Sequence, residues 1–196
     1  MIRHYIEAHW VAAALFMGVA LLLLVPLGIL GGGRAMLLIY LASPIYMLHQ
    51  GEEHLGDRFR TYVNKVVFGG VEALTTGDVL MINLPGVWGI NLAALYAAHF
   101  FGSGWGLAAG YLILVNGLSH VGMAARLRGY NPGLGSALLV FIPFGLYFAF
   151  QIPGTALQQG VGLVVAIGIH PAIALHALHR ARVGGLASLR ATPSEA

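Results

Sequence analysis

The sequence predicts an all-α, polytopic membrane protein with about six transmembrane helices. The chain has 196 residues, of which 58% are hydrophobic and only 9% are charged, and its mean hydropathy is +0.81. A spanning helix needs about 20 mostly apolar residues, and six such stretches lie near residues 9–30, 35–54, 79–101, 105–125, 134–152 and 159–179. We therefore expect one transmembrane domain over residues 1–182 and a short, flexible cytoplasmic tail over residues 183–196.

The first apolar stretch is expected to be a span and not a cleavable signal peptide. Its run from Trp10 to Leu30 is too long, and no small-residue cleavage site leads into a soluble region. The chain has no cysteine, which excludes disulfides, thiolate metal sites and cysteine nucleophiles. It also lacks a basic patch with interleaved aromatic residues, so nucleic acid is not expected as a partner.

The basic residues predict the topology. When the loops are assigned alternately to two sides, one side carries nine of the ten Lys and Arg residues and the other carries only Arg34. Positive residues concentrate on the cytoplasmic side, so six spans with both termini in the cytoplasm are predicted. The longest connection, residues 55–78, would then be cytoplasmic. Its apolar residues follow a roughly helical spacing, which predicts an interfacial amphipathic helix.

The most conspicuous motif, His49-Gln50-Gly51-Glu52-Glu53-His54, stands at the end of the second apolar stretch. A carboxylate in a membrane helix costs roughly 2.5–3.5 kcal/mol on insertion scales, so such residues usually have a partner and a function. On a helix His49, Glu52 and Glu53 occupy positions i, i+3 and i+4 and project from one face. Metal binding is the leading interpretation of this face.

Two other spans supply side chains at a similar depth. Asn116 and His120 are i and i+4 in the fourth stretch, and His170 in the sixth precedes a proline that should kink the helix. His49, His120 and His170 precede the next cytoplasmic arginine by six to ten residues. At about 1.5 Å per residue they should lie roughly 9–15 Å above the cytoplasmic charges. His99 fails this test, because it belongs near the outer end of the third stretch.

Neutral imidazoles with a carboxylate form a ligand set for zinc, and also for non-haem iron or manganese. We predict a divalent metal, zinc first and iron next, bound by His49, His120, His170 and Glu53. Glu52 would be the general base toward a water molecule activated by the metal, and Asn116 would orient a ligand or hold a substrate carbonyl. The reverse assignment of the two glutamates stays open.

The number of metal ions also stays open. A ferritin-like dinuclear site normally takes four carboxylates from its helices, which this layer does not offer. A histidine-rich dinuclear site would draw on further side chains, namely Glu7, His9, His54 or His176.

Three sequence features together resemble the HXXEE family of bacterial integral membrane proteins. They are His49-x-x-Glu52-Glu53, Asn116-x-x-x-His120, and Tyr130-Asn131-Pro132-Gly133 running into an apolar span. The resemblance covers roughly residues 40–150. It implies a location in the bacterial inner membrane and supports the motif residues as the functional set, but it implies no particular activity. His170 rests on the depth argument instead.

The expected function is that of a membrane-embedded metalloenzyme acting on a hydrophobic or amphiphilic, lipid-like substrate. Hydrolysis is favoured slightly over iron-dependent oxidation. The alternatives are a carrier of protons or metal ions and a non-catalytic subunit of a larger membrane complex. A carrier needs polar residues across the whole membrane, and the outer half offers few: Asn91, Tyr96, His99 and Gln151. The expected partners are the lipid bilayer and the substrate, and a homo-oligomer or larger membrane complex stays open.

Overall fold

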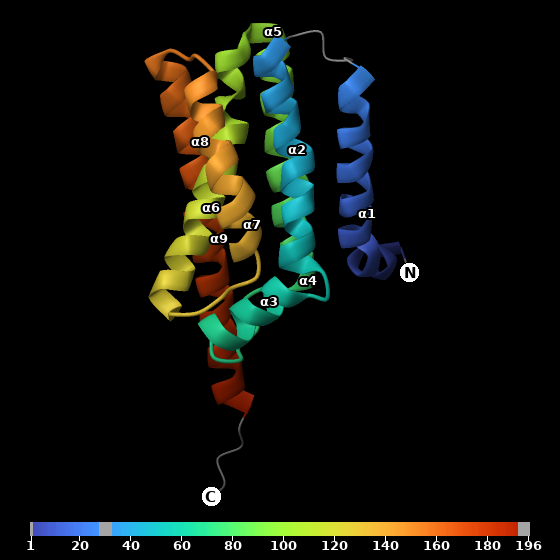
Figure 1. The fold of residues 1–196 in the computed structure, drawn as a ribbon. Helices are drawn as coiled ribbons and strands as arrows, with labels where there is room; N and C mark the ends of the chain where they lie inside the picture. Colours follow the sequence, from blue (N-terminus) through green and yellow to red (C-terminus); the bar gives the residue numbers. More distant parts are fainter. Residues whose placement is uncertain (1, 28–32, 192–196) are drawn as a thin grey trace, which may run out of the picture.

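The computed structural model describes residues 2–27 and 33–191, with side chains for 4–27 and 33–184, and within these ranges the only regular elements are helices. The long helices lie side by side in a bundle (Figure 1). α1 (Ile2–Leu24) continues into a short 3₁₀ turn, η1 (Val25–Leu27), and α2 (Gly33–His54) follows. In the bundle α2 packs against α1, α5 and α6.

After the helices α1 and α2, a third long helical segment, or rod, of the bundle consists of α4 (Thr76–Met81), η3 (Ile82–Trp88) and α5 (Gly89–Phe101) in succession. It begins at a capping box, in which the Thr75 hydroxyl accepts a hydrogen bond from the Asp78 backbone N–H at 3.2 Å and the Asp78 carboxylate accepts one from the Thr75 N–H at 2.8 Å. η3 is a π-helical stretch containing Pro85, which has no N–H to donate to the preceding turn.

The remaining rods complete the bundle. η4 (Ser103–Gly106) leads into α6 (Leu107–Leu127), and α7 (Leu134–Ser136), η5 (Ala137–Phe141) and α8 (Ile142–Gln151) form the next rod. α9 (Ala156–Ala191) is the last helix. Each predicted stretch thus contains a helix. The sequence predicts a flexible tail from residue 183, whereas in the structure α9 continues as a helix to Ala191. Residues 192–196 of the predicted tail, and residues 28–30 of the first predicted stretch, lie outside the described residues.

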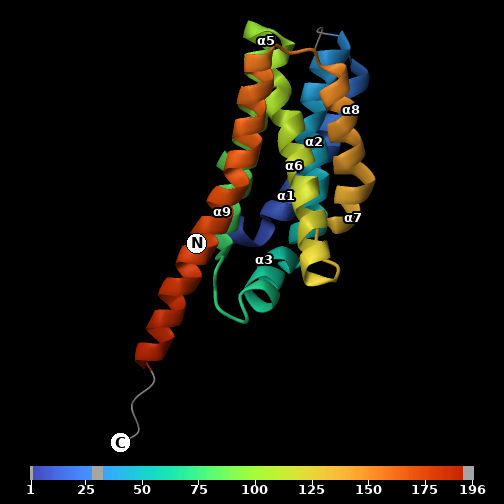
Figure 2. The ribbon, with the colours of Figure 1, turned by 90° about the vertical axis from the view of Figure 1, so that its left-hand side faces the viewer.

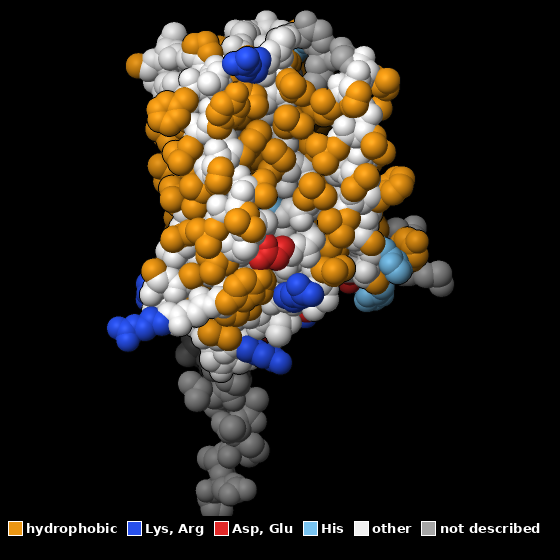
Figure 3. All heavy atoms as spheres, viewed as in Figure 1, with side chains coloured by type: hydrophobic (Ala, Val, Ile, Leu, Met, Phe, Trp, Pro, Cys, Tyr) orange, Lys and Arg blue, Asp and Glu red, His pale blue; other side chains and the backbone are white. Residues whose placement is uncertain are grey.

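Five of these helices are long and apolar enough to cross a membrane, which identifies an integral membrane protein. They cover His4–Leu27, Thr76–Phe101, Ser103–Leu127, Leu134–Gln151 and Ala156–Gly184. Large apolar side chains face outward from them: Phe16, Leu139 and Phe150 are 75, 81 and 85% exposed. The apolar surface forms a broad band on the face shown in Figure 3. α2 is not among the five, because polar residues occupy its C-terminal end.

The long connection contains the helical segment that its apolar spacing predicts. α3 (Arg58–Tyr62) and the π-helical η2 (Val63–Val67) lie across the lower end of the bundle (Figure 1). Asn64 fixes the following loop, since its side-chain oxygen accepts hydrogen bonds from the backbone N–H groups of Ala73 at 3.0 Å and Leu74 at 2.9 Å. Val63 and Leu74 then pack against Ala177 of α9.

α6 and α9 pack closely at their N-terminal ends and diverge below (Figure 2). The close approach depends on Gly162, where an added Cβ would lie 3.1 Å from the Ala108 nitrogen and 3.2 Å from the Leu107 carbonyl carbon. These are backbone atoms and cannot rotate away. The divergence below this contact leaves room between the two helices.

Substituting Gly162 with alanine should therefore lower the thermal stability of the detergent-purified protein. We expect a loss of about 1–3 kcal/mol from overpacking, measured as a lower midpoint of thermal unfolding. Gly160→Ala on the same helix is the matched control, because a Cβ there meets nothing within 4 Å, and alanine is the better helix former. Equal midpoints for the two variants would contradict this account of the α6–α9 contact.

Candidate metal centre

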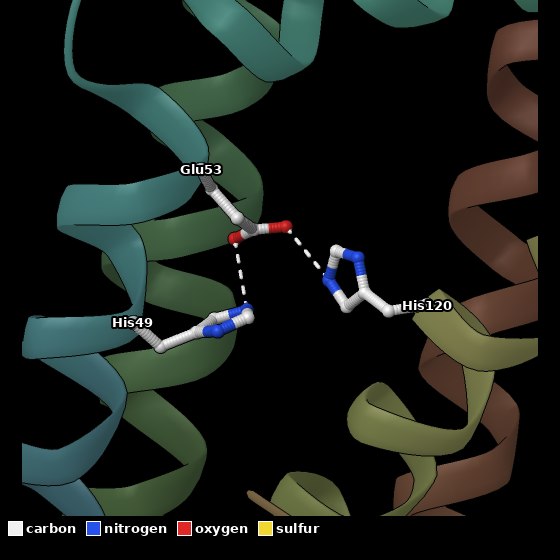
Figure 4. A group of neighbouring side chains, drawn as sticks. All are labelled: His49, Glu53 and His120. Carbon is white, nitrogen blue, oxygen red and sulfur yellow. Dashed lines mark ion pairs between the residues drawn. The ribbon is translucent and has the colours of Figure 1, made fainter. Parts of the chain in front are cut away.

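Three buried side chains from α2 and α6 point toward one another: His49, Glu53 and His120 (Figure 4). Glu53 Oε1 lies 3.1 Å from His120 Nε2, and Glu53 Oε2 lies 3.5 Å from His49 Nε2. The three residues are only 1, 5 and 3% exposed, in sequence order. One ligand atom from each lies within 4.8 Å of the other two, so the group could hold a metal ion.

The hydrogen bonds of His49 determine which ring nitrogen carries its proton. His49 Nδ1 lies 2.6 Å from the Ser136 hydroxyl oxygen. The single hydroxyl hydrogen of Ser136 is donated to the Glu52 carboxylate, so Nδ1 must be the donor to Ser136. In a neutral imidazole Nε2 then has a free lone pair, and this buried atom has no hydrogen-bond partner. Its lone pair faces Glu53.

His120 is oriented in the same way by Asn131. The amide nitrogen of Asn131 donates to the backbone carbonyl of His120 at 2.9 Å, which directs the amide oxygen toward His120 Nδ1 at 2.6 Å. Since an amide oxygen can only accept, Nδ1 carries the proton. The Nε2 lone pair of His120 is therefore directed at Glu53 Oε1.

A third histidine contacts the same carboxylate. His54 Nε2 lies 3.3 Å from Glu53 Oε2, and a hydrogen-bond chain begins at the Trp88 ring N–H, which donates to Gln50 at 3.0 Å. Gln50 in turn donates to the Asn83 oxygen at 2.8 Å, which places the Asn83 amide nitrogen 3.2 Å from His54 Nε2. Because that nitrogen only donates, His54 Nε2 also lacks a proton in the neutral ring.

In their neutral forms, the three histidines thus present nitrogens without a proton to the Glu53 carboxylate. A buried carboxylate without a partner is strongly destabilised, so a cation, either a metal ion or an added proton, must compensate it. The spacing suits a metal: donor atoms around a tetrahedral zinc with bonds of about 2.0–2.1 Å lie roughly 3.3 Å apart. The two ion-pair separations, 3.1 Å from His120 Nε2 to Glu53 Oε1 and 3.5 Å from His49 Nε2 to Glu53 Oε2, are close to this value.

The structure does not bring Glu52 into the group. One oxygen of its carboxylate accepts hydrogen bonds from the Tyr130 hydroxyl at 2.7 Å and the Gly135 N–H at 3.0 Å, and the other accepts from the Ser136 N–H at 2.6 Å and the Ser136 hydroxyl. Burial and this bond raise the pKa of Tyr130. Glu52 thus caps the N-terminus of the rod that begins with α7, where helix N–H groups lack partners.

The segment 130–136 supports the whole centre. It supplies the acceptors for both histidines, through Asn131 and Ser136, and the donors to Glu52. Gly133 allows this close approach, because a Cβ there would lie 2.5 Å from His120 Cε1 and 2.9 Å from Glu53 Cγ. Its φ of 100° also favours glycine.

A cavity of about 770 Å³ opens beside the group, and Glu53, His54 and His120 line it. Its other walls are mainly apolar and come from α3, η2, η3, α6 and α9. This volume lies within the range of about 300–1,000 Å³ that small-molecule sites occupy. The cavity gives the buried cluster access to an apolar ligand.

Asn116 and His170, also predicted for the site, line this cavity but are not part of the His49–Glu53–His120 group. The Asn116 amide nitrogen donates to the Tyr46 hydroxyl at 2.8 Å. His170 Nδ1 lies 2.8 Å from the Ala166 carbonyl oxygen, which only accepts, so His170 Nε2 has a free lone pair.

The other residues left open for a dinuclear site lie elsewhere. His176 pairs with Asp78 at 3.0 Å, the His9 ring packs against Tyr5, and Glu7 lies 3.4 Å from His4. Sequence reasoning missed Ser136 and Tyr46 and gave no role to Asn131. The turn motif Tyr130-Asn131-Pro132-Gly133 was the signal for Asn131, whereas nothing local distinguishes Ser136 or Tyr46 from other residues of their helices.

Comparison with known proteins shows the family of the chain but no activity. No curated protein and no solved structure matches the chain. A family model described as "Protein of unknown function with HXXEE motif" matches residues 40–148, which is more than half of the chain and includes the part of α2 from residue 40, all of α6 and the segment 130–136. The protein belongs to the HXXEE family.

Proposed function

We propose that the protein is a membrane-embedded, metal-dependent enzyme that acts on a lipid-like substrate, with hydrolysis favoured over iron-dependent oxidation. One observation carries the proposal: imidazole lone pairs and a carboxylate converge, buried, at the wall of a large apolar cavity. Perturbed ionisable groups in an apolar pocket are typical of active sites.

In this proposal His49, Glu53 and His120 are the metal ligands, and Ser136 and Asn131 hold the two imidazole rings in the binding tautomer. Two imidazoles and a carboxylate suit zinc first and non-haem iron second. A bound zinc ion would act as a Lewis acid and bring the pKa of water to about 7.

The chain's own groups suggest where protons move. Glu52 is a poor general base, because both its oxygens accept hydrogen bonds from the 130–136 segment. We assign it instead to positioning that segment. The free Nε2 atom of His170, on the α9 wall of the cavity, is the better proton acceptor.

We further propose that α2 also crosses the membrane, which gives six spans with both termini cytoplasmic in a bacterial inner membrane. The polar residues of α2 do not oppose this, since His49, Gln50 and Glu53 are buried inside the bundle and need not face lipid. On the face shown in Figure 3, the Lys and Arg side chains lie mostly at the lower end of the bundle. α3 and η2 would then lie at the cytoplasmic interface.

Elemental analysis of tag-free, detergent-purified protein tests the metal directly. We expect about one zinc per chain in the native protein. Glu53→Gln and His120→Ala should lose it, because each removes a ligand from a small set. His99→Ala is the matched control for His120→Ala, since His99 is an exposed residue near the outer end of α5.

Equal metal content in these variants and the native protein would overturn the site assignment. Iron in place of zinc would favour the oxidative reaction. Native protein that stays free of metal after reloading would mean that an added proton compensates Glu53, and would favour the proton carrier.

A second prediction concerns the contact between Ser136 and His49, which sets the tautomer of the His49 ring. Ser136→Ala should weaken zinc binding about 10–100-fold, as loss of a ligand's hydrogen-bond partner commonly does, measured by titration against a chelator of known affinity. Ser119→Ala is the control, because the Ser119 hydroxyl donates to the Val115 carbonyl of its own helix. Unchanged affinity in Ser136→Ala would show that Ser136 does not set the protonation of His49.

A further inference from the structure

We infer that the cavity takes a neutral, hydroxylated, single-chain amphiphile from the bilayer, and that Asn116 and Tyr46 bind its hydroxyl group. The inference names the substrate class of the proposed enzyme and rests on that function for its reaction. The binding itself rests on the cavity alone. Both residues line the cavity together with Glu53 and His120.

The hydrogen bond between the two side chains leaves one acceptor and one donor unused. Asn116 Nδ2 donates to the Tyr46 hydroxyl at 2.8 Å, whereas Asn116 Oδ1 is buried and has no hydrogen-bond partner. A buried, unpaired acceptor is unfavourable until a donor reaches it. The Tyr46 hydroxyl uses its oxygen as acceptor and keeps its own hydrogen for another group. A ligand hydroxyl both donates and accepts, so it complements this pair.

The pair is close to the candidate metal centre. Asn116 precedes His120 by four residues on α6, which places the two side chains about one helical turn, or 5.4 Å, apart along one face. A hydroxyl bound at Asn116 would therefore hold a neighbouring ester or amide bond beside His120 and Glu53. This is the role of a residue that positions the substrate.

The charges lining the cavity argue against an anionic headgroup at the pair. Among the lining residues the one Lys or Arg is Arg126, which is exposed at the C-terminal end of α6. Arg126 lies ten residues beyond Asn116, roughly 15 Å along the helix. A phosphate or carboxylate at Asn116 would have no Lys or Arg side chain beside it.

The mouth of the cavity indicates where the apolar chain lies. The exposed lining residues include Gly122 on α6 and Ala174 and Leu178 on α9, in the halves of the two helices that diverge in Figure 2. Neither Gly122 nor Ala174 has a large side chain to close the gap. A chain held in the apolar cavity would pass between the helices into the surrounding lipid.

The test uses a matched pair of non-hydrolysable probes, 1-O-hexadecylglycerol and its di-O-methyl ether, which lacks hydroxyl groups. Binding to the full-length protein in lipid nanodiscs is measured by native mass spectrometry. We expect the alkylglycerol to bind about fivefold more tightly, the effect of one hydrogen bond. Asn116→Leu and Tyr46→Phe should abolish the preference. Tyr46→Phe keeps the ring that packs on His49 and Phe141.

Asn91→Leu is the matched control. Asn91 is fully buried in α5, does not line the cavity, and should keep the preference when substituted. Equal binding of the two probes to the native protein, or an unchanged preference in both Asn116→Leu and Tyr46→Phe, would overturn the inference. Zinc content is measured on the same samples. Selective binding without metal would uphold this inference while refuting the proposed enzyme, and metal without selective binding would do the reverse.

Discussion

The buried carboxylate of Glu53 is the constraint around which the lower half of this bundle is organised. An unpaired charge at this depth would be strongly destabilising, yet its neighbours His49, His54 and His120 present nitrogens whose other contacts leave them without a proton. Each of these histidines is held by a separate group. Ser136 holds His49, Asn131 holds His120, and the Trp88–Gln50–Asn83 chain holds His54. These side chains therefore form one connected system around Glu53, and its centre requires a cation.

The adjacent glutamates of the motif have separate tasks because neighbouring helix positions point in different directions. Glu53 faces the histidines, whereas Glu52 faces the start of the α7–α8 rod and accepts its free N–H groups. The 130–136 segment is thus attached to α2 by one glutamate while it orients the ligands around the other. Loss of function on changing Glu52 would consequently say little about chemistry, since the same change releases the segment that orients His49.

Much of the architecture could be predicted from the sequence, because apolar stretches of spanning length are a strong local signal. The helical spacing of His49 and Glu53, and the depth of His120, also indicated the group that the structure brings together. Other parts could not be predicted. The direction of a side chain such as Glu52 depends on which helix packs beside it, and the bond between Ser136 and His49 joins residues 87 positions apart. Depth along a span says nothing about lateral distance, and His170 lines the cavity without joining the group.

The attachment of α2 to the 130–136 segment also bears on how the protein is made. α2 is the second helix to be synthesised, and it is less apolar than the five helices that meet the criteria for a span. The groups that satisfy Glu52, His49 and His120 come from residues 130–136, which follow only after α6 is complete. Until then Glu52 and the Nδ1 atom of His49 lack these partners, so the proposed spanning position of α2 is least favourable at that stage. Packing of α7 and η5 against α2 would therefore complete the centre and stabilise the proposed span α2 in the same step, so that only the fully assembled bundle would carry a binding-competent site.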